Sequence, residues 1–203
     1  TAVIFAFSLA FNNSSFYDPY WSVAPIVMVC YWSFGAGSPL RAIVVAALVW
    51  AWGVRLTYNF LKGWPNVRHE DWRYVNIRKQ SGGAYWLVSF LGIHLAPTVW
   101  VYLGCLAFYP AFTSARPFDA NDVFGALFTT GAIALETIAD RQLWQFRREN
   151  PAPGAIMKSG LWKKSRHPNY LGEISFWWGL YFVGLGANPA LWWAIAGPLG
   201  ITL

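Results

Sequence analysis

Three pairs of polar residues, each spaced four positions apart, interrupt apolar stretches of this 203-residue sequence. The pairs are Arg55 with Asn59, Glu136 with Asp140, and Asn169 with Glu173. Residues four apart share one face of a helix. Ionisable groups are expensive to desolvate within apolar helices, so they usually mark ligand sites. We therefore expect one polar cluster, which also includes Asp18 and binds a ligand. The alternative is an Arg–carboxylate network that only locks helices together.

A basic stretch, residues 158–173, leads into the last of these pairs. Gly160 interrupts any helix before it, and Pro168, which has no N–H group, suits the first turn of a new helix. Cationic groups next to buried polar side chains suit phosphate, and Arg binds phosphate in a bidentate manner. The sequence thus predicts an anionic ligand at this helix start, beside Lys158, Lys163, Lys164, Arg166 and His167.

The segments that carry these residues have the composition of membrane helices. Hydrophobic residues make up 56% of the chain and charged residues only 12%, whereas a soluble domain has about 25% charged residues. The 14 Trp residues suit the two membrane interfaces. We predict an all-α fold, a polytopic helical membrane bundle of about seven transmembrane helices. It forms a single domain over residues 1–203, and both ends, which lie in apolar runs, look truncated.

The expected spans follow the apolar runs between turn-forming residues. They cover residues 1–11, 20–34, 40–61, 83–112, 119–144, 169–186 and 189–203. Twelve of the 15 Lys and Arg residues fall on one face of this arrangement, in the loops 62–83 and 141–168. Arg41 and Arg116 fall in the opposite loops. By the positive-inside rule, the basic face lies in the cytoplasm or an equivalent compartment. Two long loops on one face also indicate a cap over a cavity.

Several other patterns favour structural roles. The residues His69, Glu70 and Asp71 are consecutive, so their side chains diverge, and a surface network with Arg68 and Arg73 is favoured over a metal site. His94, alone in an apolar run, is expected to pack between helices. The two Cys residues form no Cys-x-x-Cys pattern, so we expect no metal. The basic residues match no nucleic-acid motif, so no nucleic-acid partner is expected.

Residues 160–173 resemble the C-terminal signature of the steroid 5α-reductase superfamily. They are closest to its bacterial, DUF1295-like branch and are similar to the corresponding block of sterol C14 and Δ7 reductases. Residues 18–25, 52–59, 69–74 and 140–144 provide further matches. The resemblance implies a membrane oxidoreductase of the 3-oxo-5α-steroid 4-dehydrogenase type. Such an enzyme binds NADPH from the cytosolic side and transfers hydride to the C=C bond of an enone in a steroid-like or other lipid substrate.

The same resemblance assigns site residues. It implies that the cofactor is bound by Arg55, Asn59, Glu136, Asp140, Lys158, Arg166, His167, Asn169, Tyr170 and Glu173. Asp18 falls where steroid reductases place a catalytic Glu. These reductases carry a proton-donating Tyr one turn before the third-helix Arg, where this chain has Trp52. Tyr58, one turn after Arg55, and Tyr20 are the candidates to replace it.

Two alternatives remain open on the sequence. The motif from Arg166 to Gly172 is similar to that of membrane methyltransferases of the isoprenylcysteine or phospholipid type, which use S-adenosylmethionine. Asn169 and Glu173 favour the reductase. Trp52 is compatible with a non-catalytic, reductase-like subunit of a larger membrane assembly that binds membrane lipid.

Overall fold

The computed structural model describes residues 1–149, 152 and 154–203, and within these ranges it contains helices and no strand. The prediction of an all-α fold is therefore confirmed. The α-helices are α1 (Ala2–Phe11), α2 (Tyr17–Ser33), α3 (Pro39–Gly63), α4 (Trp72–Ser81), α5 (Tyr85–Val88), α6 (Ala96–Phe108), α7 (Pro110–Thr113), α8 (Ala120–Arg148), α9 (Pro168–Ala187) and α10 (Ala196–Thr202). Short 3₁₀ segments are η1 (Ser14–Phe16), η2 (Gly82–Ala84), η4 (Gly160–Lys163) and η5 (Pro189–Ile195), and η3 (Ser89–Leu95) is a π-helix.

Helical structure is present at each of the seven expected spans. Three helical stretches are long and apolar enough to cross a membrane: Pro39–Gly63, Trp72–Thr113 and Ala120–Arg148. The predicted loop 62–83 contains α4, which the sequence did not predict. The predicted loop 141–168 starts too early, because α8 continues to Arg148. Residues 150, 151 and 153 of that loop lie outside the described residues.

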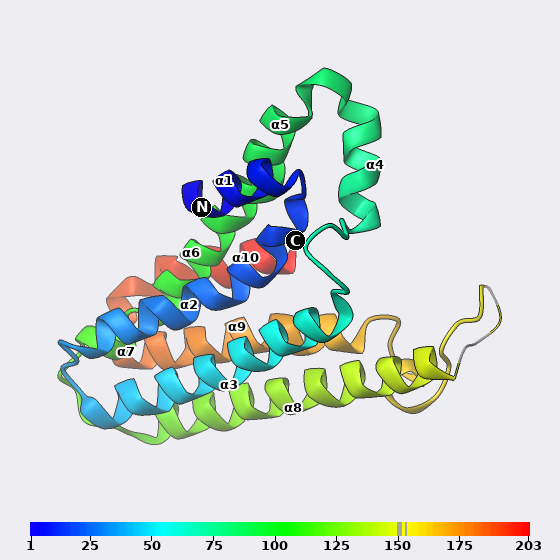
Figure 1. Cartoon of the computed structure of the whole chain (residues 1–203). Coiled ribbons are helices and arrows are strands. Elements are labelled where there is room, and N and C mark those ends of the chain that lie inside the picture. The colour runs from blue at the N-terminus through cyan, green and yellow to red at the C-terminus, as the bar shows by residue number, and fades with distance from the viewer. Residues whose placement is uncertain (150–151, 153) are drawn as a thin grey trace.

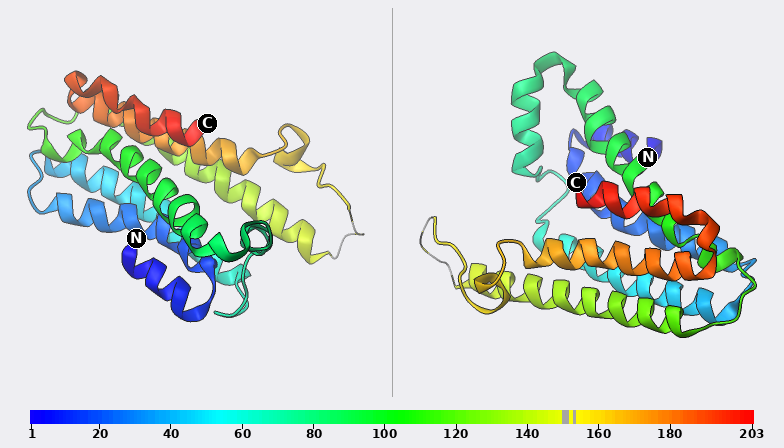
Figure 2. Two further views of the ribbon diagram at one scale, coloured as in Figure 1. Left: turned by 90° about the horizontal axis from the view of Figure 1, so that it is seen from above. Right: turned by 180° about the vertical axis from the view of Figure 1, so that it is seen from behind.

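The long helices α2, α3, α8 and α9 lie side by side (Figure 1). The α4 helix and the start of the next helical stretch project from this bundle as an arm, beside α1 (Figure 2). The C-terminal α10 packs along α6 and α9. The apolar core lies between α2, α3, α6 and α9, and its fully buried members include Val49, Phe108 and Leu180.

The contact between α8 and α9 depends on residues without large side chains. A Cβ atom on Gly172 would lie 2.7 Å from the Cβ atom of Glu136 and 2.8 Å from its backbone nitrogen. A Cβ atom on Gly179 would collide with Thr129. Small residues allow helix backbones to approach closely, as in many membrane proteins. The two helices are therefore packed backbone to backbone at the level of Glu136.

A buried ion pair joins α3 to α8 at the end of the bundle where α3 begins. Arg41 is only 1% exposed, and its Nε and Nη2 atoms donate to the two carboxylate oxygens of Asp122, each at 2.7 Å. The same guanidinium donates to the carbonyl oxygens of Arg116 and Pro117. The prediction that Arg41 is a loop residue was wrong. Arg41 lies in the first turn of α3 because Pro39 already begins that helix.

Candidate functional site

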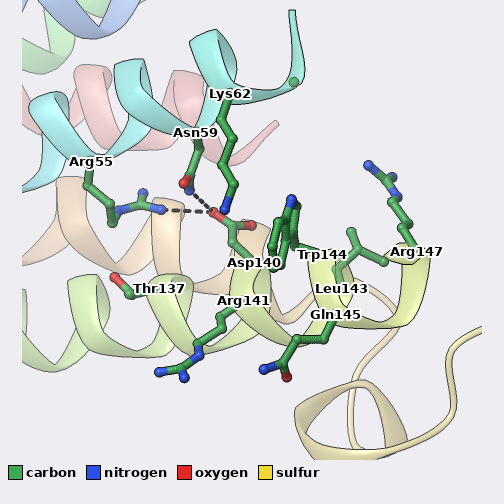
Figure 3. A pocket seen from close by; sticks show the side chains of 11 residues that line it. Arg55, Asn59, Lys62, Thr137, Asp140, Arg141, Leu143, Trp144, Gln145 and Arg147 are labelled. Atoms are coloured by element: carbon green, nitrogen blue, oxygen red, sulfur yellow. Dashed lines mark hydrogen bonds and ion pairs between the residues drawn. The ribbon is translucent and has the colours of Figure 1, made fainter. Parts of the chain in front are cut away.

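A cavity of about 490 Å³ lies between the C-terminal halves of α3 and α8 (Figure 3). This volume is within the range of small-molecule sites, roughly 300–1,000 Å³. Its lining residues are mostly polar or charged: Arg55, Asn59, Lys62, Gly63, Thr137, Asp140, Arg141, Leu143, Trp144, Gln145 and Arg147. Arg55, Asn59 and Lys62 recur every three or four residues along α3, so they share one face of that helix. The cavity is thus a candidate ligand site built on two long helices.

Asp140 is held at the inner wall of this cavity. Its Oδ2 atom accepts hydrogen bonds from Arg55 Nη1 at 2.8 Å and from Asn59 Nδ2 at 3.2 Å. Arg55 also forms an ion pair with Glu136, which is only 3% exposed. The helical spacing thus correctly grouped these four residues. Among the described residues, Arg55 Nε and Glu136 Oε2 are buried without a hydrogen-bond partner. Of these two residues, only Arg55 lines the cavity.

The outer part of the cavity is cationic and aromatic. Lys62 Nζ lies 3.4 Å from the centroid of the Trp144 ring, and the Arg148 guanidinium carbon lies 4.6 Å from it. Arg141 and Arg147 also line the opening (Figure 3). Cations around an indole suit a ligand that carries both phosphate groups and flat rings. We did not predict Lys62, Trp144 and Arg147 as site residues. They continue the three- and four-residue spacing of Asn59 and Asp140, and that signal was present in the sequence.

The predicted cofactor residues of the basic stretch lie at the same end of the bundle, but outside this cavity as the described residues form it. Lys158, Arg166, His167 and Tyr170 are exposed, and the rings of His167 and Tyr170 stack with centroids 5.2 Å apart. Asn169 Oδ1 is buried, and no residue of the described chain bonds to it.

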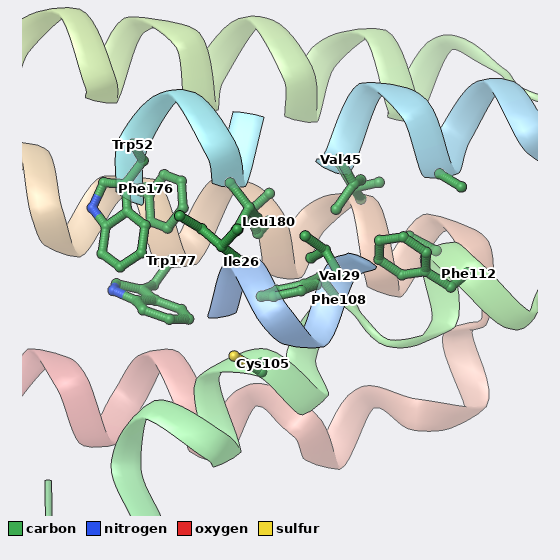
Figure 4. Close-up of a cluster of buried hydrophobic side chains, with 14 of the residues drawn as sticks. Ile26, Val29, Val45, Trp52, Cys105, Phe108, Phe112, Phe176, Trp177 and Leu180 are labelled. Carbon is green, nitrogen blue, oxygen red and sulfur yellow. The ribbon is translucent and has the colours of Figure 1, made fainter. Parts of the chain in front are cut away.

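Glu173, on α9, bonds to two of the aromatic side chains that Figure 4 shows packed together, Trp52 and Trp177. Its two carboxylate oxygens accept hydrogen bonds from Trp52 Nε1 at 2.8 Å and Trp177 Nε1 at 2.7 Å. The Trp52 ring stacks on Phe176, with centroids 4.5 Å apart, and meets Trp21 edge-on at 5.7 Å. The indoles thus fix Glu173 between helices α3 and α9. Trp52, the residue at the position where the sequence resemblance led us to look for a Tyr, is one partner that holds it.

A second cavity, of about 700 Å³, contains Asp18. Tyr74 on α4 donates a hydrogen bond of 2.5 Å to Asp18 Oδ1, and Arg73 Nη2 lies 3.7 Å from Asp18 Oδ2. The expectation that Asp18 joins the Arg55 cluster was therefore wrong. Asp18 is in the first turn of α2 and faces α4, whose helical structure we did not predict.

The candidate proton donor Tyr58 lines neither cavity, as far as the described residues define them. Its side chain is 61% exposed on the outer face of α3. Successive helix positions are turned by about 100°. Asn59 therefore follows Arg55 on the inner face while Tyr58 points away.

The remaining sequence candidates have structural roles. His94 is fully buried, with Nε2 3.0 Å from Ser8 Oγ and Nδ1 2.9 Å from the Ser89 carbonyl oxygen, so the prediction of a packing histidine is confirmed. Asp71 pairs with Arg73 as predicted, whereas Glu70 pairs with Arg78 on α4. The described part of the chain contains no group of three His, Cys, Asp or Glu residues that could hold a metal ion.

These features define an all-α protein with membrane-length helices, a polar cavity beside a buried Arg–carboxylate cluster, and a second cavity beside Asp18. The chain belongs to the DUF1295 family, described as proteins of unknown function, which matches residues 4–203. An uncharacterized protein of Schizosaccharomyces pombe is 28% identical over 226 residues, which cover 98% of this chain and 66% of that protein. The chain therefore spans just under two thirds of that relative's length. No solved structure shows a significant match to this chain.

Proposed function

We propose that this protein is a membrane-embedded, seven-span reductase that uses NADPH to reduce the C=C bond of an enone in a lipid-like substrate. The observation that carries the proposal is the cavity between α3 and α8. It combines a cationic, aromatic opening with an inner wall formed by the Arg55–Asp140 ion pair. The resemblance of residues 160–173 to the reductase signature supports the same activity.

The residues present fit a dinucleotide of this kind. Lys62, Arg141 and Arg147 supply the positive charge that the pyrophosphate and the 2′-phosphate need. The Trp144 ring holds the Lys62 ammonium group at the cavity, with Nζ 3.4 Å from the ring centroid. Asp140, held by two hydrogen bonds, can accept one from a ribose hydroxyl group. When bound, NADPH supplies the hydride for the reduction.

The chain's own task in such a reaction is electrostatic. The carbonyl oxygen of an enone gains negative charge as hydride reaches its β-carbon, so a hydrogen-bond donor fixed near that oxygen lowers the barrier. A closed, apolar surrounding strengthens this interaction. Trp21, Trp52 and Phe176 provide such a surrounding, because Trp52 stacks on Phe176 and meets Trp21 edge-on.

The test is ligand binding to the purified protein in detergent micelles. We expect micromolar binding of NADPH, followed by its own fluorescence. Arg141→Ala and Arg147→Ala should each weaken binding about tenfold, which corresponds to about 1.4 kcal/mol and to the loss of one charge-assisted hydrogen bond. Lys79→Ala is the matched control, because Lys79 is an exposed cation on α4 that lines neither cavity.

Other ligands separate the competing functions. Binding of S-adenosylmethionine without binding of NADPH would show a methyltransferase. Binding of neither would favour a non-catalytic subunit. With NADPH bound, oxidation of the cofactor on addition of 3-oxo-Δ4 steroids and simpler enones tests catalysis. The absence of turnover with every enone would refute the enzymatic part of the proposal.

A further inference from the structure

The arm helix α4 lies across the bundle rather than along it. It crosses the direction of α3, α8 and α9, on the side of the bundle where α3 ends (Figure 1, Figure 2). This is the basic end, where Lys62, Arg141 and Arg147 line the opening of the first cavity. The helices α3 and α8 are long and apolar enough to span a membrane. A helix that crosses their end therefore lies along the membrane surface, as interfacial helices do.

The two faces of α4 differ in chemistry. Tyr74 and Ile77 face the protein and pack in an apolar cluster with residues of α2 and η3. The outer face carries Trp72, Asn76 and Lys79, which are spaced three or four residues apart and are all exposed. The Trp72 side chain is 70% exposed. An indole in this position suits the headgroup level of a membrane, where an apolar ring meets water.

The outer surface of α4 and of the loop before it carries an uncompensated positive charge. Both acidic residues of this segment, Glu70 and Asp71, form ion pairs with arginines of α4. The two exposed cations Arg68 and Lys79 form no ion pair with any described residue. A surface with two free cations and an exposed indole is complementary to anionic headgroups at a membrane.

The backbone around Arg68 is fixed by hydrogen bonds. Asn13 Nδ2 donates to the carbonyl oxygens of Val67 and His69, at 2.8 Å and 3.0 Å. The backbone nitrogen of Arg68 itself donates to Asn66 Oδ1 at 2.9 Å. These bonds hold the chain on both sides of Arg68, while its side chain stays exposed. A cation on a fixed backbone loses less conformational entropy on binding than one on a mobile loop.

We infer that Arg68 and the outer face of α4 form a docking surface for the headgroups of anionic lipids. Arg68 and Lys79 bind the lipid phosphates, and the Trp72 ring lies at the headgroup level. None of these three residues lines either cavity, as the described residues form them. The surface needs neither NADPH nor an enone, so it is independent of the proposed function.

The experiment measures amide hydrogen exchange of α4 in the full chain, reconstituted in lipid nanodiscs. One set of nanodiscs contains phosphatidylcholine alone, and the other contains equal parts of phosphatidylcholine and anionic phosphatidylglycerol. Bound headgroups stabilise the docked helix, so exchange should be slower in the anionic membrane. We expect about a fivefold effect for each cation, equivalent to about 1 kcal/mol. Added salt should remove the difference, because it screens exposed charges. Equal exchange in the two membranes would overturn the inference.

Matched variants separate this surface from a general attraction between the basic protein and the membrane. Arg68→Gln with Lys79→Gln should make the exchange of α4 equal in the two membranes. Lys163→Gln with Lys164→Gln removes the same charge from exposed residues at the end of η4 and should preserve the difference. A difference that survives in the first variant, or is lost in both, would refute the assignment. Slower exchange in neutral nanodiscs on addition of glycerol 3-phosphate would indicate a site for soluble anions instead.

Discussion

The buried ion pair between Arg41 and Asp122 gives the sharpest quantitative prediction. Both side chains are 1% exposed, and the guanidinium donates four hydrogen bonds, two to Asp122 and two to backbone carbonyl oxygens. Arg41→Met leaves the Asp122 carboxylate buried and uncompensated, although the backbone nitrogen of Asp119 still donates to it. Removal of one partner from a buried pair destabilises a protein by about 3–5 kcal/mol. We expect a loss of this size.

A double-mutant cycle separates the pair from general disruption. Asp122→Asn keeps the shape and can still accept from Asp119, so Arg41→Met with Asp122→Asn should lose less than the sum of the single losses. We expect a coupling of about 1–3 kcal/mol. Arg41→Lys keeps the charge but cannot donate to both oxygens of Asp122 as the planar guanidinium does. Its loss of unfolding free energy should therefore lie between zero and the loss for Arg41→Met.

The assay is unfolding in mixed micelles by increasing sodium dodecyl sulfate, followed by circular dichroism. A loss below about 1 kcal/mol for Arg41→Met, or strictly additive losses, would refute the reasoning, because an exposed pair gives values of this size. Arg68→Met, at an exposed arginine outside both cavities, is the control and should be neutral.

Two further predictions concern packing and pH. Gly172→Leu should lower the free energy of unfolding by about 1–3 kcal/mol through overpacking against Glu136. The control Gly131→Leu should be neutral or slightly stabilising, because a Cβ atom there meets no neighbour. Equal losses for the two variants in the same unfolding assay would contradict this prediction. Burial tends to raise the pKa of Asp71, but the hydrogen bonds from Arg73 outweigh it, so the folded-state pKa is lowered. The stabilisation from Asp71 is then fully present above its unfolded pKa of about 3.9 and is lost as pH falls through the lower, folded value. The amide hydrogens of α4 should therefore exchange more slowly in the wild type than in Asp71→Asn at pH 6, and the two exchange rates should converge in acid. A difference between the two proteins that grows in acid would contradict the lowered pKa of Asp71.

Local patterns in the sequence located the long helices and the main polar cluster. Pro39 at the start of α3 and Pro168 at the start of α9 are local signals, so these helix boundaries were predicted to within one or two residues. The grouping of Arg55, Asn59 and Asp140 also follows from helical spacing, combined with the high cost of an unpaired charge among apolar helices.

Contacts between distant segments could not be predicted in this way. The position of Asp18 depends on α4, a polar helix whose composition is that of a loop, and tertiary contacts with α1 and α2 stabilise it. The pairing of Arg41 with Asp122 joins residues 81 positions apart, and no local pattern reports it. Glu173 was predicted to bind a cofactor, whereas in the structure its two carboxylate oxygens accept hydrogen bonds from the indoles of Trp52 and Trp177. These contacts depend on how the two indoles pack, which the sequence does not report.

Three ion pairs attach α3 to α8 at two points along its length. The Arg41–Asp122 pair pins one end, and the Arg55–Asp140 pair holds the other, 14 residues or about 21 Å along the helix. Because α8 and α9 are packed backbone to backbone at Gly172, we expect these two helices to behave as one rigid unit. A ligand that exchanges partners with Asp140 leaves α3 attached at both points, because Arg55 also pairs with Glu136.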